Sequence, residues 1–183
     1  PVTVQYGGRT YVPHNYNNRY HGMVTMKQAL ALSLNTATVR FCQRTGFAGL
    51  ASFVNQAGFS RRAHPYPSLC LGTLDVSPLE LASVYTLFLN QGVIRPATPF
   101  AAAAAGRVTP GRPVQLVSAG AAFIVLDMMR EAVERGTAAN IRRLGIILPL
   151  AGKTGTARDG WFVGLTGNLA VCCWTGYDDN QEF

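Results

Sequence analysis

The segment 146–177, IILPLAGKTGTARDGWFVGLTGNLAVCCWTGY, decides the fold that this sequence predicts. It contains three runs with the residue types of strands, 146–157, 161–166 and 169–177, and only Gly167-Asn168 separates the last two. A dipeptide of this kind between two apolar runs is typical of a two-residue β-hairpin turn. We therefore expect three consecutive antiparallel strands at the end of the chain.

Helices are predicted upstream of this meander. Thr25 and Gln28 form a capping box that begins a helix through residue 32, and Ser33-Leu34-Asn35 breaks the pattern because Ser and Asn side chains divert backbone hydrogen bonds. The order of helices first and strands last indicates an α+β fold, in which helices cover an antiparallel sheet. The helical part is expected at about 21–136, with further helices at 36–45, 48–57, 78–91 and from 114 or 118 to 135. We expect a loop at 61–71, a loop or irregular strand region at 101–113, and a short strand or turn near 7–12.

Composition favours one folded domain. Of the 183 residues, 48% are hydrophobic and only 14% are charged, which excludes a disordered chain. The net charge is +7, but the arginines stand singly or in pairs, so we expect a basic surface and no nucleic-acid partner. No apolar stretch reaches the roughly 18 residues of a membrane-spanning helix. Both ends are abrupt, and we expect a fragment, incomplete at both ends, whose membrane contacts lie outside it.

Several common kinds of site are absent from the sequence. The four cysteines, Cys42, Cys70, Cys172 and Cys173, lack the spacing of a zinc site, so no metal is expected, and the adjacent pair is interpreted as small core residues. The three histidines fall in predicted loops, and no Walker A, G-x-S-x-G or H-E-x-x-H motif occurs. If the chain belongs to an enzyme, we expect lysine and serine as its proton carriers.

Lys153 is the strongest candidate for such a role. Sixteen residues are lysine or arginine, yet only Lys27 and Lys153 are lysines. An ammonium can take part in proton transfer when its surroundings lower its pKa, which a guanidinium cannot do. Thr154 and Thr156 share one face of a strand, so two hydroxyls beside one cation are suited to bind a carboxylate, and Gly155 lets a substrate backbone approach. The alternative interpretation is a solvated lysine at the end of a surface strand.

The order of two short motifs adds to this interpretation. Ser33-x-Asn35 alone is an ordinary pair at a helix break, but here a Lys-Thr-Gly-Thr strand follows it after several helices. That order, S-x-N and then K-T-G, is shared by the penicillin-recognising serine acyltransferases. The chain resembles the transpeptidase domain of class A penicillin-binding proteins in five collinear stretches, 11–36, 71–82, 133–138, 152–164 and 176–180, whose first and last members span nearly the whole chain.

This resemblance implies a peptidoglycan D,D-transpeptidase that cross-links stem peptides ending in D-Ala-D-Ala and is acylated by β-lactam antibiotics. By motif, Lys153, Ser33 and Asn35 would be catalytic: Lys153 holds the proton network, Ser33 relays a proton and Asn35 binds the acyl side. Thr154, Gly155 and Thr156 would bind the substrate: the two threonines hold its terminal carboxylate, and the Thr156 N–H forms half of an oxyanion hole. No cofactor is implied. The resemblance also implies a preceding glycosyltransferase domain and a location at the extracytoplasmic face of the bacterial inner membrane.

One motif of the family is missing. The nucleophile of these enzymes lies in S-x-x-K, and no serine here is followed by lysine at that spacing. Because this motif precedes S-x-N in the family, we expect it before Pro1 and expect the chain alone to be inactive. Two alternatives stay open: a serine β-lactamase or penicillin sensor, and a non-catalytic module that binds peptidoglycan or a partner. Against a class A β-lactamase, no carboxylate at 62–75 is flanked like a deacylating glutamate.

Overall fold

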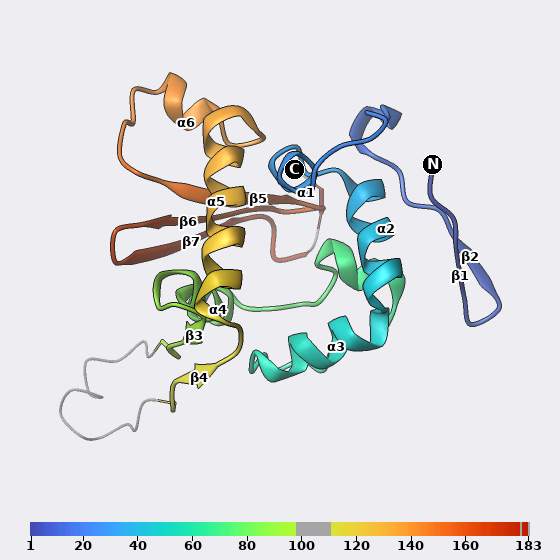
Figure 1. Cartoon of the computed structure of the whole chain (residues 1–183), viewed down its shortest axis with the longest axis horizontal. Coiled ribbons are helices and arrows are strands. Elements are labelled where there is room, and N and C mark those ends of the chain that lie inside the picture. Colours follow the sequence, from blue (N-terminus) through green and yellow to red (C-terminus); the bar gives the residue numbers. More distant parts are fainter. Residues whose placement is uncertain (98–110, 180, 183) are drawn as a thin grey trace.

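The elements of the computed structural model follow the order helices, then sheet (Figure 1). The structure describes residues 1–97, 111–179 and 181–182. Its helices are α1 (Met26–Ala31), α2 (Asn35–Thr45), α3 (Phe47–Gln56), α4 (Pro78–Leu89), α5 (Ala119–Arg135) and α6 (Asn140–Arg143). The main strands are β5 (Ala151–Thr156), β6 (Gly160–Thr166) and β7 (Leu169–Thr175). The remaining elements are short: β1 (Val4–Tyr6), β2 (Arg9–Tyr11), β3 (Val93–Ile94), β4 (Val114–Gln115) and the 3-10 turns η1 (Tyr16–Asn18) and η2 (Pro67–Leu71).

The three-stranded antiparallel meander is confirmed. Strand order is β5-β6-β7, Lys153 lies opposite Val163, and Gly167 turns the chain at a φ of 52°, a conformation that glycine adopts without strain. The first strand is shorter than expected, because it begins at Ala151 and not near 146. The reason is Arg142, whose Nη1 donates to the carbonyl oxygens of Ile146 and Leu148 and so holds these residues in a loop.

The helix starts follow the capping signals in the sequence. Capping boxes form at both Thr25 and Ser77, and Ser118 caps α5 by accepting from the Ala121 N–H. Of the two starts considered for α5, the later is therefore right, and residues 114–115 instead pair with β3 as β4. The short α6 was not predicted. Residues 101–110 of the region expected as a loop at 101–113 lie outside the described residues.

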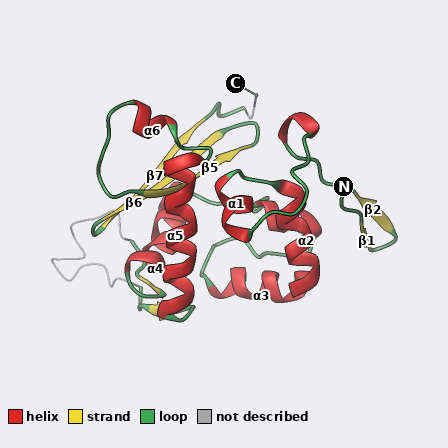
Figure 2. Cartoon of the chain, turned by 45° about the horizontal axis from the view of Figure 1, so that its top comes forward, coloured by secondary structure: helices red, strands yellow, loops and turns green. Residues whose placement is uncertain are grey.

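The helices cover one face of the sheet. Figures 1 and 2 show α5 crossing the three strands, with α4 and α1 on either side of it, and α5 contacts β5 while α4 contacts β7. Met129 of α5 packs on Ala151 and Leu165 in the buried interface. The β7 side chains alternate accordingly: Cys172 is half-buried on the covered face and Cys173 is exposed. The prediction that both cysteines are core residues is therefore wrong for Cys173, because it points away from the helices.

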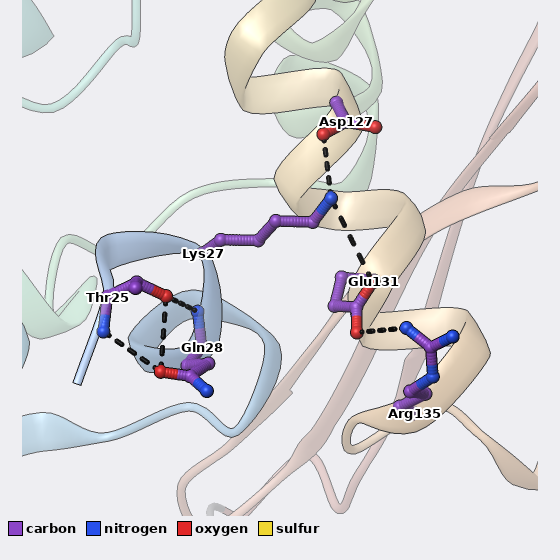
Figure 3. A network of polar contacts seen from close by, with 6 residues as sticks. All are labelled: Thr25, Lys27, Gln28, Asp127, Glu131 and Arg135. Carbon is purple, nitrogen blue, oxygen red and sulfur yellow. Dashed lines mark hydrogen bonds and ion pairs between the residues drawn. The ribbon is translucent and has the colours of Figure 1, made fainter.

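Helices α1 and α5 lie side by side and end at the same level. Near the start of α1, Lys27 Nζ donates to Asp127 at 2.8 Å and lies 3.9 Å from Glu131, which also pairs with Arg135 (Figure 3). At the C-terminal end of α1, the carbonyl oxygen of Ala31 accepts a hydrogen bond of 3.1 Å from the N–H of Thr137, which lies just after α5. The two contacts connect α1 to α5 near both ends of α1. No helix in the described part of the chain is long and apolar enough to cross a bilayer.

Candidate active site

Ser33 lies at the C-terminal end of α1 in a backbone conformation that glycine usually adopts. Its φ is 53°, its N–H donates to the Leu30 carbonyl at 3.1 Å, and the Leu34 N–H donates to the Ala29 carbonyl at 2.9 Å. These two hydrogen bonds form a Schellman motif, in which the left-handed residue is most often glycine. A serine here keeps a hydroxyl at the exposed end of the helix at the cost of backbone strain. The helix break expected at Ser33-Leu34-Asn35 is confirmed.

Lys153 reaches this hydroxyl from the sheet. Its Nζ donates to Ser33 Oγ at 2.8 Å and to the carbonyl oxygen of Thr154 at 2.8 Å. Within the described ranges no carboxylate lies within 4.0 Å of this ammonium. Burial lowers the pKa of Lys153 below its ordinary value, because desolvation disfavours the charged form. The contact therefore pairs a hydroxyl with an ammonium that gives up its proton more readily than a solvated lysine.

Asn35 is the first residue of α2 and stands beside the same turn. Its Nδ2 donates to the carbonyl oxygen of His14 at 2.8 Å, which ties the start of α2 to the N-terminal segment. The neighbouring Asn15 supports this position, because its Oδ1 accepts from both the N–H and the hydroxyl of Thr36 at 3.0 Å. In the part of the chain that the structure describes, no hydrogen bond joins Asn35 to Lys153. The side-chain oxygen of Asn35 remains an acceptor for a ligand N–H.

The two threonines of the Lys-Thr-Gly-Thr strand share one face of β5, as the spacing predicts. Thr154 is half-buried and Thr156 is exposed. Thr154 Oγ1 lies 2.6 Å from Thr137 Oγ1. Gly155 lies opposite Trp161, and a Cβ at this glycine would come within 3.2 Å of the Trp161 Cβ. A side chain at position 155 would therefore crowd Trp161, which favours glycine here independently of any substrate.

Thr137 is a member of this constellation that reasoning from the sequence missed. It follows Gly136, which ends α5, and a Cβ on that glycine would lie 2.2 Å from the Ala31 carbonyl oxygen. This close approach brings the end of α5 against the end of α1 and directs Thr137 towards β5. The only sequence signal was a hydroxyl residue directly after a helix-ending glycine, which is too common to indicate a site by itself.

A second feature missed from the sequence holds the loop after Thr156. The carboxylate of Asp159 accepts hydrogen bonds from the indole N–H groups of Trp161 at 2.9 Å and Trp174 at 2.7 Å. The two indole rings meet edge to face with their centroids 6.4 Å apart. This cluster links the β5–β6 loop to β7. It fixes the end of the strand that carries Thr156.

The arrangement brings four elements to one place: the end of α1, the start of α2, the end of α5 and strand β5. Together they present one ammonium, the four hydroxyls of Ser33, Thr137, Thr154 and Thr156, and one side-chain amide. Such a set can bind an anion and move a proton between oxygen or nitrogen atoms, which is the chemistry of acyl transfer. The described residues contain no group of His, Cys, Asp and Glu side chains that could hold a metal ion.

Comparison with protein families and sequences gives consistent matches. Residues 2–168 match the family described as the penicillin binding protein transpeptidase domain. The chain is 33% identical over 183 residues to penicillin-binding protein 1B of Vibrio cholerae, covering 95% of this chain and 24% of that protein. It is also 33% identical over 192 residues to penicillin-binding protein 1B of Haemophilus influenzae, covering 100% and 25% respectively. The chain thus spans about a quarter of the length of these relatives.

Solved structures share the fold. Penicillin-binding protein 1A from Haemophilus influenzae superposes with a TM-score of 0.83 at 23% identity, over 98% of this chain and 34% of that one. Penicillin-binding protein A from Mycobacterium tuberculosis, solved as an imipenem acyl-enzyme complex, gives a TM-score of 0.71 at 21% identity, over 95% and 48%.

Proposed function

Because the chain belongs to the penicillin-binding protein transpeptidase family, we propose that it is the later part of one D,D-transpeptidase domain that cross-links peptidoglycan stem peptides through a serine acyl-enzyme. The observation that carries this proposal is the 2.8 Å hydrogen bond from Lys153 Nζ to Ser33 Oγ, because it joins the two motifs across 120 positions of sequence. The 183 residues contain no Ser-x-x-Lys, so the nucleophile belongs to another part of the full-length protein.

The proposed reaction uses the same proton carriers twice. The nucleophilic serine attacks the D-Ala-D-Ala carbonyl carbon, the C–N bond breaks, and the departing D-Ala amine gains a proton. The amine of a second stem peptide then attacks the ester, gives up a proton, and releases the serine. Ser33 is suited to both transfers because it accepts a hydrogen bond from Lys153, which leaves its own hydrogen to donate. Lys153 can replenish or take up that proton because burial lowers its pKa.

The strand supplies the groups for substrate binding. In the proposed pose, Thr154 and Thr156 donate to the terminal carboxylate, with the Lys153 charge nearby, and Gly155 leaves room for the peptide backbone. Among the described strands β5 pairs with β6 alone, and the Thr154 carbonyl accepts from Lys153 Nζ. Residues two apart direct their backbone groups to the same side, which supports a Thr156 N–H aimed into the site. Removing one such oxyanion donor typically costs about 2.7–4 kcal/mol in the transition state.

Asn35 completes the proposed site on the acyl side. Its Nδ2 is bonded to the His14 carbonyl, so we assign its Oδ1 to the N–H of the penultimate residue of the stem peptide. β-Lactams fit the same groups because they present a carboxylate and an acylating carbonyl. A relative of the same fold is described as an imipenem acyl-enzyme complex, which supports this assignment. The substrate is extracytoplasmic, so we propose this location for the domain, with a glycosyltransferase domain elsewhere in the full-length protein.

A non-catalytic module that binds peptidoglycan through the same groups is the second candidate. The observation in its favour is that the 183 residues contain no Ser-x-x-Lys motif, which holds the nucleophile in this family. It differs from the transpeptidase in one measurable property: it binds penicillin-like ligands without forming a covalent bond.

The test is covalent labelling of the full-length protein with a fluorescent penicillin. We expect the wild type to be labelled and Lys153→Ala to lose most of the labelling. Lys27→Ala is the matched control, because Lys27 is the other lysine and its exposed ion pairs lie on the far end of α1. Undiminished labelling of Lys153→Ala would refute the role of Lys153. An unlabelled wild type that still binds the ligand would favour the non-catalytic module.

A further inference from the structure

Thr137 and Thr154 form a hydroxyl pair at the site. Their Oγ1 atoms are 2.6 Å apart, a distance typical of a short O–H···O hydrogen bond. A hydroxyl has one hydrogen and two acceptor lone pairs, so only one of the two donates in this pair. The direction of that single hydrogen bond decides what Thr154 offers to a ligand.

The position of Thr137 is fixed by the backbone around it. Its N–H donates to the Ala31 carbonyl at 3.1 Å, and the close approach of Gly136 to Ala31 leaves no room for a side chain there. The same hydrogen bond connects Thr137 to the end of α1, two residues before Ser33. Backbone contacts that do not involve its hydroxyl therefore hold Thr137 at the end of α1, and the hydroxyl itself lies beside Thr154.

The two directions of the hydrogen bond have opposite consequences for an anion. If Thr154 donates to Thr137, Thr154 presents only lone pairs to an incoming carboxylate and repels it. If Thr137 donates to Thr154, the Thr154 hydrogen is available for the carboxylate. An anion held by the Lys153 charge selects the second direction, and two hydrogen bonds in series polarise each other.

We propose that Thr137 is a positioning residue of the carboxylate site: it donates its hydroxyl hydrogen to Thr154 and so turns the Thr154 hydroxyl towards the carboxylate of the acyl donor. This inference rests on the proposed function and adds to it a residue outside its three motifs. Thr137 acts only through Thr154, so its contribution exists only for donors that carry a carboxylate. A residue that merely packs α5 against β5 would affect all donors alike.

The test compares two acyl donors on the full-length protein. One is a thioester donor that ends in a free carboxylate, and the other is the same molecule with a methyl group in its place, which accepts no hydrogen bond. In Thr137→Val, which keeps the shape but lacks the hydroxyl, we expect the second-order acylation rate constant to fall about five- to tenfold for the carboxylate donor, as for loss of one neutral hydrogen bond. For the methyl donor we expect little change, and Thr137→Ser should restore most of the rate for the carboxylate donor.

Two further measurements separate the outcomes. In a Thr154→Val background, Thr137→Val should have no additional effect on the preference for the carboxylate donor. Circular dichroism checks folding, and Thr137→Ala replaces the valine variant if that variant does not fold. An equal loss with both donors, no loss with either, or no rescue by serine overturns the role of Thr137 while the proposed function stands. A wild type that neither donor nor penicillin acylates overturns the proposed function, and the inference with it.

Discussion

Ser33 combines a strained backbone with a functional hydroxyl. Non-glycine residues with a φ near 53° are uncommon, and the left-handed conformation costs an L-residue roughly 1–2 kcal/mol. Strain of this kind is often found at sites of function, and here it places a hydroxyl 2.8 Å from Lys153 Nζ. A glycine would end α1 equally well but could not contact the lysine.

Comparison of two Ser33 variants separates strain from function. Ser33→Gly and Ser33→Ala both remove the hydroxyl, so both should lose most penicillin labelling. Only the glycine relieves the left-handed strain, and we expect Ser33→Gly to be more stable than Ser33→Ala by about 1 kcal/mol in chemical unfolding. An alanine variant as stable as the glycine variant would contradict the strained conformation of Ser33.

Lys153 should make stability depend on alkaline pH. Its pKa in the folded protein is lowered by burial below 10.5, its ordinary value. Below the folded pKa both states are protonated and the full penalty for burying the charge is present. Between the folded pKa and 10.5 the unfolded chain binds more protons, so stability rises with pH through this window.

Lys153→Met removes this titration. We expect the difference in unfolding free energy between the wild type and the methionine variant to shift in favour of the wild type as pH rises towards 10.5. The measurement is denaturant unfolding of both proteins at several pH values from 7 upwards, and the comparison cancels all other titrating groups. A difference that does not change with pH would show that burial does not perturb Lys153.

At the scale of a single element, Glu80 has a perturbed pKa like Lys153, and its carboxylate caps the N-terminus of α4. It accepts from the N–H groups of Ser77 at 2.8 Å and Ser60 at 2.7 Å, and these hydrogen bonds lower its pKa from 4.5 to about 2. One carboxylate thus completes the capping box and fastens the segment after α3 to the start of α4. The side chain is half-buried, so solvent still weakens the effect.

The pH dependence of Glu80 has the opposite sign to that of Lys153. A lowered carboxylate pKa contributes stability above pH 4.5 that is lost as pH falls towards 2, because protonation removes the accepting charge. We expect Glu80→Gln to lower stability at neutral pH and to flatten the acid side of the stability profile. Thermal unfolding of both proteins between pH 2 and 7 measures this, and parallel profiles would contradict it.

Gly136 controls how two elements meet. A methyl group there would lie 2.2 Å from the Ala31 carbonyl oxygen, a backbone atom that moves only with α1. We expect Gly136→Ala to cost about 1–3 kcal/mol, as for an overpacked contact, and to reduce labelling because the ends of α1 and α5 separate. Gly120→Ala on the same helix is the control, since nothing lies within 4 Å there. That substitution should be neutral or stabilise by about 0.5–1 kcal/mol, and equal effects would refute the close approach.

At the scale of the whole molecule, one apolar interface supports the site from behind. Leu165 of β6 is 2% exposed and packs with Met129 of α5 and Ala151, two residues before Lys153. Because β5 carries Lys153 and Thr154 and because Thr137 follows the end of α5, this interface sets the distance between these site residues.

Truncation of that interface should act on stability and on the site together. We expect Leu165→Ala to cost about 2–5 kcal/mol in unfolding free energy and to lower penicillin labelling. Leu169→Ala makes the same chemical change at a residue that is 55% exposed, and should stay within about 0.5 kcal/mol of the wild type. Similar losses in the two variants would mean that the sheet is not packed on α5 as described.

Local signals in the sequence predicted most elements correctly. The capping boxes at Thr25 and Ser77, the Gly167 turn and the break at Ser33 each depend on residues within a few positions of one another. The errors occurred where a distant residue decided the outcome. Arg142 donates to the carbonyl oxygens of Ile146 and Leu148, which were expected in a strand. Among the described residues, helices cover the sheet face opposite to Cys173, and this cysteine is exposed.

The sequence by itself determined the main helices, the three strands of the meander and its hairpin, because propensity, capping and turn geometry act over one or two helical turns. It also supplied the candidate residues Ser33, Asn35 and 153–156. Only the tertiary structure decided that Lys153 contacts Ser33 across 120 positions, that α1 and α5 end together at Gly136, and that Thr137 pairs with Thr154. These contacts depend on how complete helices pack on the sheet. Their partners are distant in sequence, and no local pattern encodes the distance between them.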